Sequence, residues 1–304
     1  MDMNLYELMK GRKHHFPEAK VKNYIYQLMK ALDHMHKNGI FHRDIKPENV
    51  LLAEDMLKLA DFGSCRGIYS KQPFTEYIST RWYRAPECLL TDGYYNYKMD
   101  IWGVGCVFFE ILTFVPLFPG QNELDQINKV HNILGTPPAE LLAKFQTQAS
   151  HMTFNFQPTE GSGFERMLTH VSAEARLLIK KMLAYNPDDR ITARQVLKDA
   201  YFADLREMEQ PKIAPSPALT GKLYSGDGDN PSSNEDSMRA SEAGREDIPS
   251  LPPIKGKPVV SRKLLPPAIA HNSSNKSITM ELKAGQKRGK NYVSPYGRKF
   301  YRNG

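Results

Sequence analysis

The chain has 304 residues and a hydrophobic content of 40%, which is enough for a packed core. Its three scattered cysteines argue against a disulfide framework or a cysteine-rich zinc site, and they fit a reducing compartment such as the cytoplasm. The net charge of +7 comes from the end of the chain alone, because residues 1–204 hold 24 basic and 24 acidic side chains whereas residues 205–304 hold 17 and 10.

The first third of the chain predicts helices and one hairpin. Residues 1–41 are expected to form two helices, the second over 17–37, where apolar side chains recur at helical spacing before an Asn-Gly stop. Two short apolar runs, 50–52 and 57–59, flank a polar turn and predict a hairpin. Residues 61–95 show no sustained period and are rich in Ser, Thr, Gly and Tyr, as expected of a long functional loop.

The middle of the chain predicts a helix that is buried on every side. Residues 97–113 are apolar nearly all round, and their most hydrophobic part is too short to cross a bilayer. We therefore expect a core helix and no membrane association. Amphipathic helices are expected near 123–134, 173–184 and 192–205, with an irregular stretch over 136–168.

The composition changes after about residue 209, where Pro, Ser, Gly and Asn dominate. Such a segment buries too little apolar surface to offset the entropy of ordering it, which predicts a folded domain over 1–208 and a disordered tail over 209–304. From residue 255 onward the tail holds 12 basic residues and one acidic residue. It fits nuclear import, nucleic-acid contact or docking to an acidic partner, and the alternative is a solvated tail without such a role.

One stretch carries the chemistry. The run HRDIKPEN at 42–49 is followed, twelve residues after its end, by Asp61 of a DFG triplet. Asp44, Lys46 and Asn49 are expected on one irregular loop, and Asp61 returns after the hairpin. Phosphoryl transfer needs a carboxylate for the acceptor hydroxyl, oxygen ligands for Mg²⁺ and a cation near the phosphate. This spacing can supply all three, and the alternative is a charged turn after a helix.

These segments resemble the catalytic loop and the magnesium-binding DFG motif of protein kinases. The resemblance implies that Asp44 is the catalytic base and that Lys46 contacts the transferred phosphate. It implies that Asn49 and Asp61 hold Mg²⁺, and that Leu51 forms the floor under the adenine of ATP. The structural positions implied in the same segments, including the lower half of a hydrophobic stack, are His42, Phe62 and Gly63.

The resemblance continues through most of residues 1–204. Ala-Pro-Glu, ending at Glu87, closes the loop that the DFG motif opens. By the same resemblance Glu87 pairs with Arg190, and Asp100 of the buried helix braces the backbone of the catalytic loop. The alternative for each of these residues is an ordinary surface charge.

A Thr-Glu-Tyr triplet inside the loop lies where mitogen-activated protein kinases take two phosphates. The resemblance implies phosphorylation of Thr75 and Tyr77, each adding roughly −1.5 to −2 charge that can order the loop against arginines. Thr80 matches the threonine that binds the catalytic aspartate and favours Ser/Thr substrates. The expected phosphate-reading arginines are Arg43 and Arg66 for Thr75, and Arg81 and Arg84 for Tyr77.

The segment RWYRAPE at 81–87, together with the extra stretch at 136–168, resembles the kinase group of cyclin-dependent and mitogen-activated kinases. This implies a serine/threonine kinase that uses ATP and Mg²⁺, prefers proline after the acceptor residue, and is switched on by an upstream kinase. We expect protein substrates, a monomer, and a cytoplasmic location with the nucleus as an addition.

A complete kinase begins with a small β-rich lobe that supplies a glycine-rich loop, a strand lysine and a helix glutamate. The catalytic loop of this chain begins at residue 42, and neither a GxGxxG motif nor a strand lysine precedes it. We therefore expect a kinase-like (α+β) fold reduced mainly to the α-helical C-terminal lobe, with weak ATP binding and impaired turnover. Whether a gene-model gap or a true isoform is the reason stays open.

Two other functions stay open. One is a non-enzymatic kinase fragment that docks substrates or partners, although the intact Asp44, Lys46, Asn49 and Asp61 count against it. The other is a nucleic-acid-associated protein that acts through the basic tail, although nucleic acid is not our expected partner.

Overall fold

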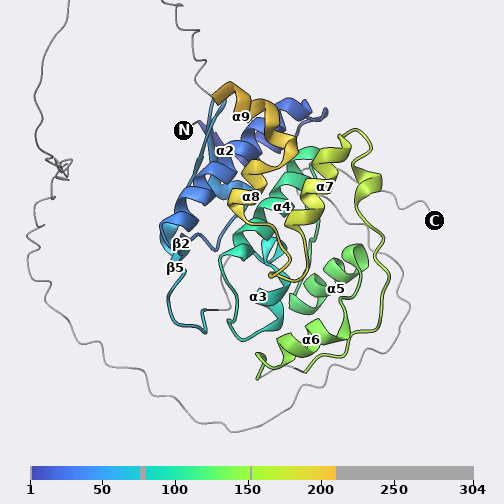
Figure 1. Cartoon of the computed structure of the whole chain (residues 1–304). Helices are drawn as coiled ribbons and strands as arrows, with labels where there is room; N and C mark the ends of the chain where they lie inside the picture. The colour runs from blue at the N-terminus through green and yellow to red at the C-terminus, as the bar shows by residue number, and fades with distance from the viewer. Residues whose placement is uncertain (1, 76–79, 151–152, 210–304) are drawn as a thin grey trace, which may run out of the picture. The chain divides into compact units, whose positions relative to one another are not determined.

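The computed structural model describes residues 2–75, 80–150 and 153–209 (Figure 1). In these residues one short strand and two helices come first, four short strands follow, and the remaining elements are mainly helices. The strands are β1 (Met3–Asn4), β2 (Ile40–Phe41), β3 (Val50–Ala53), β4 (Met56–Leu59) and β5 (Arg66–Gly67). The helices are α1 (Leu5–Met9), α2 (Glu18–Lys37), α3 (Pro86–Leu90), α4 (Lys98–Thr113), α5 (Glu123–Leu134), α6 (Ala139–Gln146), α7 (Ala173–Met182), α8 (Ala193–Lys198) and α9 (Ala203–Glu209).

Helix α4 forms the centre of the core, with α2 and α7 packed against it (Figure 1). Every residue from Met99 to Thr113 is buried, because this segment has no polar face to offer to water. The buried helix predicted over 97–113 is therefore confirmed, with its start one residue later. It provides a rigid base for the loops that reach it from both sides.

Helix α2 holds the hairpin that carries the candidate site. Strands β3 and β4 pair antiparallel with Val50 opposite Leu59, and β1 adds to the other edge of β3. The amide of Gln27 on α2 donates to the carbonyl of Asp55 and accepts from the backbone N–H of Leu57, both at 2.8 Å. The hairpin is thus fixed to α2 by backbone groups that a surface turn would leave to water.

Several boundaries differ from the sequence-based expectation. Residues 1–41 contain β1 and β2 besides the two helices, because each two-residue strand is defined by a distant partner: β1 pairs with β3 and β2 with β5. The stretch 136–168, expected to be irregular, contains α6, and the loop 61–95 contains α3. The helix expected over 192–205 is divided near Asp199, whose side chain accepts from the backbone N–H of Tyr201 and starts a new turn.

The architecture confirms the expected α+β fold that is mainly helical. In the part of the chain that the structure describes, no helix combines the length and the apolar character needed to cross a membrane. The predicted tail, apart from Glu209, lies outside the described residues, and the domain boundary at 208 stays a prediction.

The packing of α5 against the segment after α7 buries a histidine, and folding stability should therefore depend on pH. His131 of α5 is buried, its Nε2 lies 2.9 Å from the hydroxyl of Tyr185, and its ring meets the edge of Phe156. Burial lowers the pKa of His131 to about 4, from the 6.5 of an exposed histidine. The unfolded chain therefore takes up a proton at this residue before the folded chain does, and folding stability falls as pH falls below 6.5.

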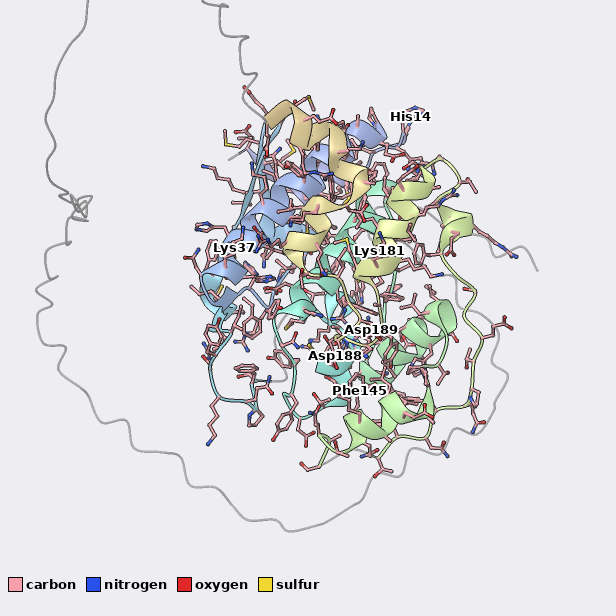
Figure 2. The ribbon with its side chains drawn as sticks, in the orientation of Figure 1. His14, Lys37, Phe145, Lys181, Asp188 and Asp189 are labelled. Carbon is pink, nitrogen blue, oxygen red and sulfur yellow. The ribbon has the colours of Figure 1, made fainter. Side chains whose placement is uncertain are left out.

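Because of His131, we expect the unfolding free energy to fall by about 1–2 kcal/mol when the pH is lowered from 7 to 5. Urea unfolding at the two pH values should show a smaller loss for His131→Gln than for the wild type, because glutamine keeps a polar group near Tyr185 but does not titrate. The matched control is His14→Gln, a change at an exposed histidine at the edge of the molecule (Figure 2). An equal loss in the wild type and in His131→Gln would contradict the prediction.

Candidate active site

The backbone of the catalytic loop is held by one buried carboxylate. Asp100, in the first turn of α4, accepts hydrogen bonds from the backbone N–H groups of His42 and Arg43, both at 2.8 Å. Its Oδ2 also lies 2.9 Å from Nε2 of His36, at the end of α2. The bracing that the resemblance implies for Asp100 is thus present in the structure. Arg43 has a left-handed backbone, with φ of 71°, which Asp100 helps to hold.

Two polar side chains of the catalytic loop, those of Lys46 and Asn49, meet at the carboxylate of Asp44. Lys46 Nζ donates to Asp44 Oδ2 at 2.9 Å, and Asn49 Nδ2 donates to the same oxygen at 3.0 Å. Asn49 Nδ2 also donates to the carbonyl of Asp44 at 2.8 Å. Asp44 is buried, so two donors oriented at its carboxylate hold it in one position. The structure therefore brings the proposed base, phosphate-contacting lysine and metal-binding amide together on one loop.

His42 connects this loop to the DFG segment. Its Nδ1 receives the backbone N–H of Asp44 at 3.3 Å, and its Nε2 lies 3.0 Å from the carbonyl of Ala60. Since a backbone N–H only donates and a carbonyl only accepts, these partners fix the tautomer with hydrogen on Nε2. The ring also meets Phe62 edge-on with centroids 5.5 Å apart. Phe62 remains 56% exposed, so His42 covers only one side of it.

Asn49 and Asp61 fit the donor set that Mg²⁺ prefers. Both N–H···O contacts of the Asn49 amide use its nitrogen, which leaves the amide oxygen available as a ligand. The carboxylate of Asp61 is exposed, and its backbone has a left-handed φ of 64°. The N–H of Ala60, next to Asp61, donates to the carbonyl of Asn49 at 2.9 Å, so the two segments are joined directly. Mg²⁺ bound with nucleotide takes one or two such protein oxygens together with phosphate oxygens.

Leu51 and Gly63 are the two other predicted site residues near the DFG segment. The side chain of Leu51 is half-buried on β3, in register with Lys58 of β4. Gly63 lies in the 3₁₀ turn that begins after Asp61, and its N–H lies 3.4 Å from Asp61 Oδ1. In the part of the chain that the structure describes, no cluster of three or more His, Cys, Asp or Glu side chains forms a metal site.

Arg43 of the catalytic loop is linked through Tyr95 to the activation-loop residue Thr75. Its Nε donates to the carbonyl of Ser64, and its Nη1 donates to the hydroxyl of Tyr95 at 2.9 Å. The same hydroxyl donates to the carbonyl of Thr75 at 2.7 Å. Arg66, the other arginine expected near Thr75, is exposed and donates to the neighbouring carbonyl of Cys65.

The other two arginines reach the segment that begins α5. Arg81 Nη1 donates to the carbonyl of Gln121 at 3.3 Å, and Arg84 Nη1 lies 3.2 Å from Glu123. Their expected ligand, Tyr77, lies outside the described residues. Thr80 is exposed and precedes the 3₁₀ turn that contains Arg81.

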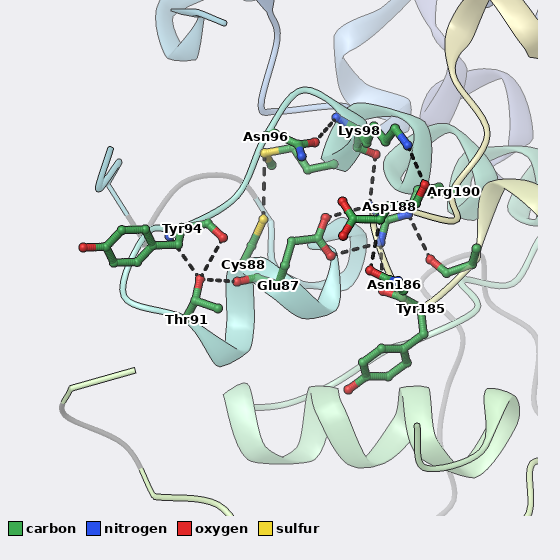
Figure 3. Close-up of polar contacts among 12 residues, drawn as sticks. Glu87, Cys88, Thr91, Tyr94, Asn96, Lys98, Tyr185, Asn186, Asp188 and Arg190 are labelled. Carbon is green, nitrogen blue, oxygen red and sulfur yellow. Dashed lines mark hydrogen bonds and ion pairs between the residues drawn. The ribbon is translucent and has the colours of Figure 1, made fainter. Parts of the chain in front are cut away.

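A buried ion pair closes the end of the activation segment (Figure 3). Arg190 makes two parallel hydrogen bonds to Glu87 of α3, at 2.6 and 2.9 Å, and both side chains are buried. Arg190 also donates to the carbonyls of Lys98, Ala184 and Tyr185, and its guanidinium lies over the ring of Trp102. The pairing that the resemblance implies is thus present, and it ties α3 to α4.

Sequence reasoning missed three residues that support the site. Nothing singles out His36 as a partner of Asp100 or Tyr95 as a partner of Arg43, because both residue types are common in helices and loops. Tyr83 donates to Glu110 at 2.7 Å inside the core. The sequence did contain a signal for this contact, because Glu110 lies within an apolar helix and a buried acidic residue needs a hydrogen-bond donor.

Comparisons with known proteins agree with this geometry. A family described as "Protein kinase domain" matches residues 1–202. The chain is 58% identical over 210 residues to the MAPK/MAK/MRK overlapping kinase of Homo sapiens, covering 69% of this chain and 50% of that protein. The Mus musculus protein of the same name is 58% identical over 214 residues, covering 70% and 51%. Serine/threonine-protein kinase MAK of Rattus norvegicus is 44% identical over 203 residues, covering 66% and 33%.

The chain therefore spans about half the length of the first two relatives. The segments DFGSCR and STRWYRAPECLLTDGYY predict a likeness to the overlapping kinases, and the comparison confirms it. The functional roles of individual site residues stay predictions.

The ion pair of Glu87 and Arg190 generates a stability prediction. Arg190→Met leaves the carboxylate of Glu87 buried without its partner, and we expect the unfolding free energy to fall by about 3–5 kcal/mol. The double change Glu87→Gln with Arg190→Met should recover part of this loss, because no uncompensated charge then remains. Urea unfolding followed by circular dichroism measures both.

The matched control for this experiment is Arg194→Met, a change at an exposed arginine on α8. It should alter the unfolding free energy by no more than about 0.5 kcal/mol. Equal losses for Arg190→Met and Arg194→Met would show that the buried pair does not anchor α3.

Proposed function

The chain belongs to the protein kinase family, and on that premise we propose that the protein transfers the γ-phosphate of ATP to serine and threonine hydroxyls of other proteins. The observation that carries this proposal is the cluster of Asp44, Lys46 and Asn49 on a loop braced by Asp100. The names of the relatives, which include serine/threonine-protein kinases, support the class of acceptor.

The proposed mechanism gives each loop residue one task. Asp44 accepts a hydrogen bond from the acceptor hydroxyl and orients it, with the carboxylate kept in place by Lys46 and Asn49. The ammonium of Lys46 lies beside that carboxylate and favours negative charge on the incoming phosphate. Asn49 and Asp61 would hold Mg²⁺. ATP would supply the phosphoryl group, and Mg²⁺ would neutralise part of the negative charge of the phosphates.

We propose that phosphorylation at Thr75 and Tyr77 regulates this activity. Supporting the proposal, the side chain of Thr75 is exposed to a modifying enzyme, while its backbone is joined through Tyr95 to the buried Arg43. A phosphate adds acceptor oxygens where arginine donors are near. A preference for proline after the acceptor follows only from the likeness of the RWYRAPE segment to its kinase group.

We propose further that the 304-residue polypeptide binds ATP weakly when it is prepared by itself. Leu51, Asn49 and Asp61 contribute to one side of a nucleotide site only. In the family, a glycine-rich loop and a strand lysine hold the phosphates from the other side. The residues before His42 contain neither motif.

The proposed base generates an activity prediction. Asp44→Asn should lower the rate of phosphate transfer to a serine-containing protein substrate by about 10²- to 10⁴-fold, because the amide cannot accept the hydroxyl proton. Radiolabelled ATP and myelin basic protein as a generic acceptor make a slow reaction measurable. Asp55→Asn, on the β3–β4 turn, is the control and should leave the rate unchanged. Equal rates for Asp44→Asn and the wild type would contradict the role of Asp44.

The metal ligands generate a binding prediction. Calorimetric titration of the 304-residue chain with Mg²⁺–ATP should give a dissociation constant above about 1 mM. Submillimolar binding that Asp61→Asn abolishes would show that this part of the site suffices, and the proposed weakness would be wrong. Undetectable binding by folded protein agrees with the proposal and leaves partner docking as the function of the isolated polypeptide.

A further inference from the structure

The middle of the activation loop, residues 72–75, is attached to one short segment, residues 93–95. The N–H of Phe74 donates to the carbonyl of Gly93 at 2.9 Å, and the amide of Gln72 donates to the carbonyl of Tyr95 at 2.7 Å. The hydroxyl of Tyr95 donates to the carbonyl of Thr75 at 2.7 Å. Three hydrogen bonds thus hold residues 72–75, although the side chain of Thr75 remains exposed.

The attachment depends on a close approach of two backbones. A Cβ atom at Gly93 would lie 2.1 Å from the carbonyl oxygen of Phe74, and Gly93 has a φ of +86°. Only glycine, which has no Cβ atom, allows both this backbone conformation and this close approach to Phe74. The contact is therefore built into the local geometry of residues 93–95.

Tyr95 is the one residue of this segment that also reaches the catalytic loop. Arginine only donates, so the Tyr95 oxygen accepts from Arg43 Nη1, and the phenol hydrogen is left for the carbonyl of Thr75. The ring is buried and packs against Phe74 and Phe41, with centroids 5.4 and 6.4 Å apart. One hydroxyl group thus joins two segments that are far apart in the sequence.

We propose that Tyr95 is a positioning residue whose hydroxyl couples the activation-loop segment 72–75 to Arg43 of the catalytic loop. The coupling exists without phosphate on Thr75, so it sets where Thr75 lies before a modifying enzyme acts. Its regulatory meaning rests on the proposed function, but the physical coupling does not.

The hydroxyl of Tyr95 remains protonated at neutral pH. Burial raises the pKa of Tyr95 to about 12. A phenolate could not donate to the carbonyl of Thr75, so the link to residues 72–75 requires the neutral form.

The test is amide hydrogen exchange of the whole 304-residue chain, read by mass spectrometry, for the wild type and Tyr95→Phe. The variant keeps the packed ring and removes only the hydroxyl. We expect exchange to become roughly 5-fold faster in peptides covering 72–75 and also in peptides covering 41–46, the factor expected for the loss of one net hydrogen bond. The measurement needs neither ATP nor catalysis, so it stands or fails separately from the proposed kinase activity.

Tyr94→Phe is the matched control, because Tyr94 is the neighbouring tyrosine and its side chain is 38% exposed. It should leave both segments unchanged. Faster exchange in only one of the two segments, or in neither, would overturn the proposal. So would an equal acceleration in peptides from α2 and α7, because that pattern reports a general loss of stability.

A second variant tests the route of the coupling. Arg43→Met alone should accelerate exchange in residues 72–75, whereas adding it to Tyr95→Phe should produce little further change there. Fully additive effects of the two changes would show that Arg43 and residues 72–75 are not joined through the hydroxyl of Tyr95.

Discussion

The candidate site depends on the carboxylate of Asp100, which lies at the start of the buried core helix α4 and accepts hydrogen bonds from two backbone N–H groups of the catalytic loop. A loop with a left-handed residue at Arg43 does not keep its shape by local preference. A buried carboxylate acceptor makes each of these hydrogen bonds strong, and His36 contacts the same carboxylate from α2. The loop that carries Asp44 is therefore held in place by a helix outside the candidate site.

Helix α4 anchors the other end of the activation segment in the same way. Its Glu110 accepts from Tyr83, and the carbonyl of Lys98 in its first turn accepts from Arg190, which in turn holds Glu87. The buried polar groups of α4 thus point toward loops on several sides, while its apolar groups form the core. This explains why a helix with so few polar residues contains two acidic ones.

The sequence predicts the long elements well because their signals are local. The periodic apolar positions of α2 and the all-round apolar character of α4 are properties of contiguous segments. Strands β1 and β2 escape prediction because two residues carry no period, and their partners are 47 and 27 residues away in the pairs Asn4–Leu51 and Ile40–Gly67. Helix α6 escapes because the two prolines before it indicate a loop, although proline also suits a helix start.

The site divides between what a motif can predict and what only packing reveals. Asp44 and Asn49, whose proposed roles are chemical, stand at the spacing of a motif and can be found by resemblance. The contacts of the Tyr95 hydroxyl are not encoded in any spacing. The difference has a physical basis. Catalytic groups must fit a substrate of constant geometry, whereas the residues that support them only have to satisfy the buried hydrogen-bonding groups of their own protein. Arg43 belongs to both classes, since its place in the loop follows from the motif and its partners, Ser64 and Tyr95, follow from the fold. The contact between the activation loop and the catalytic loop is therefore determined by packing, even though both loops are recognisable by sequence.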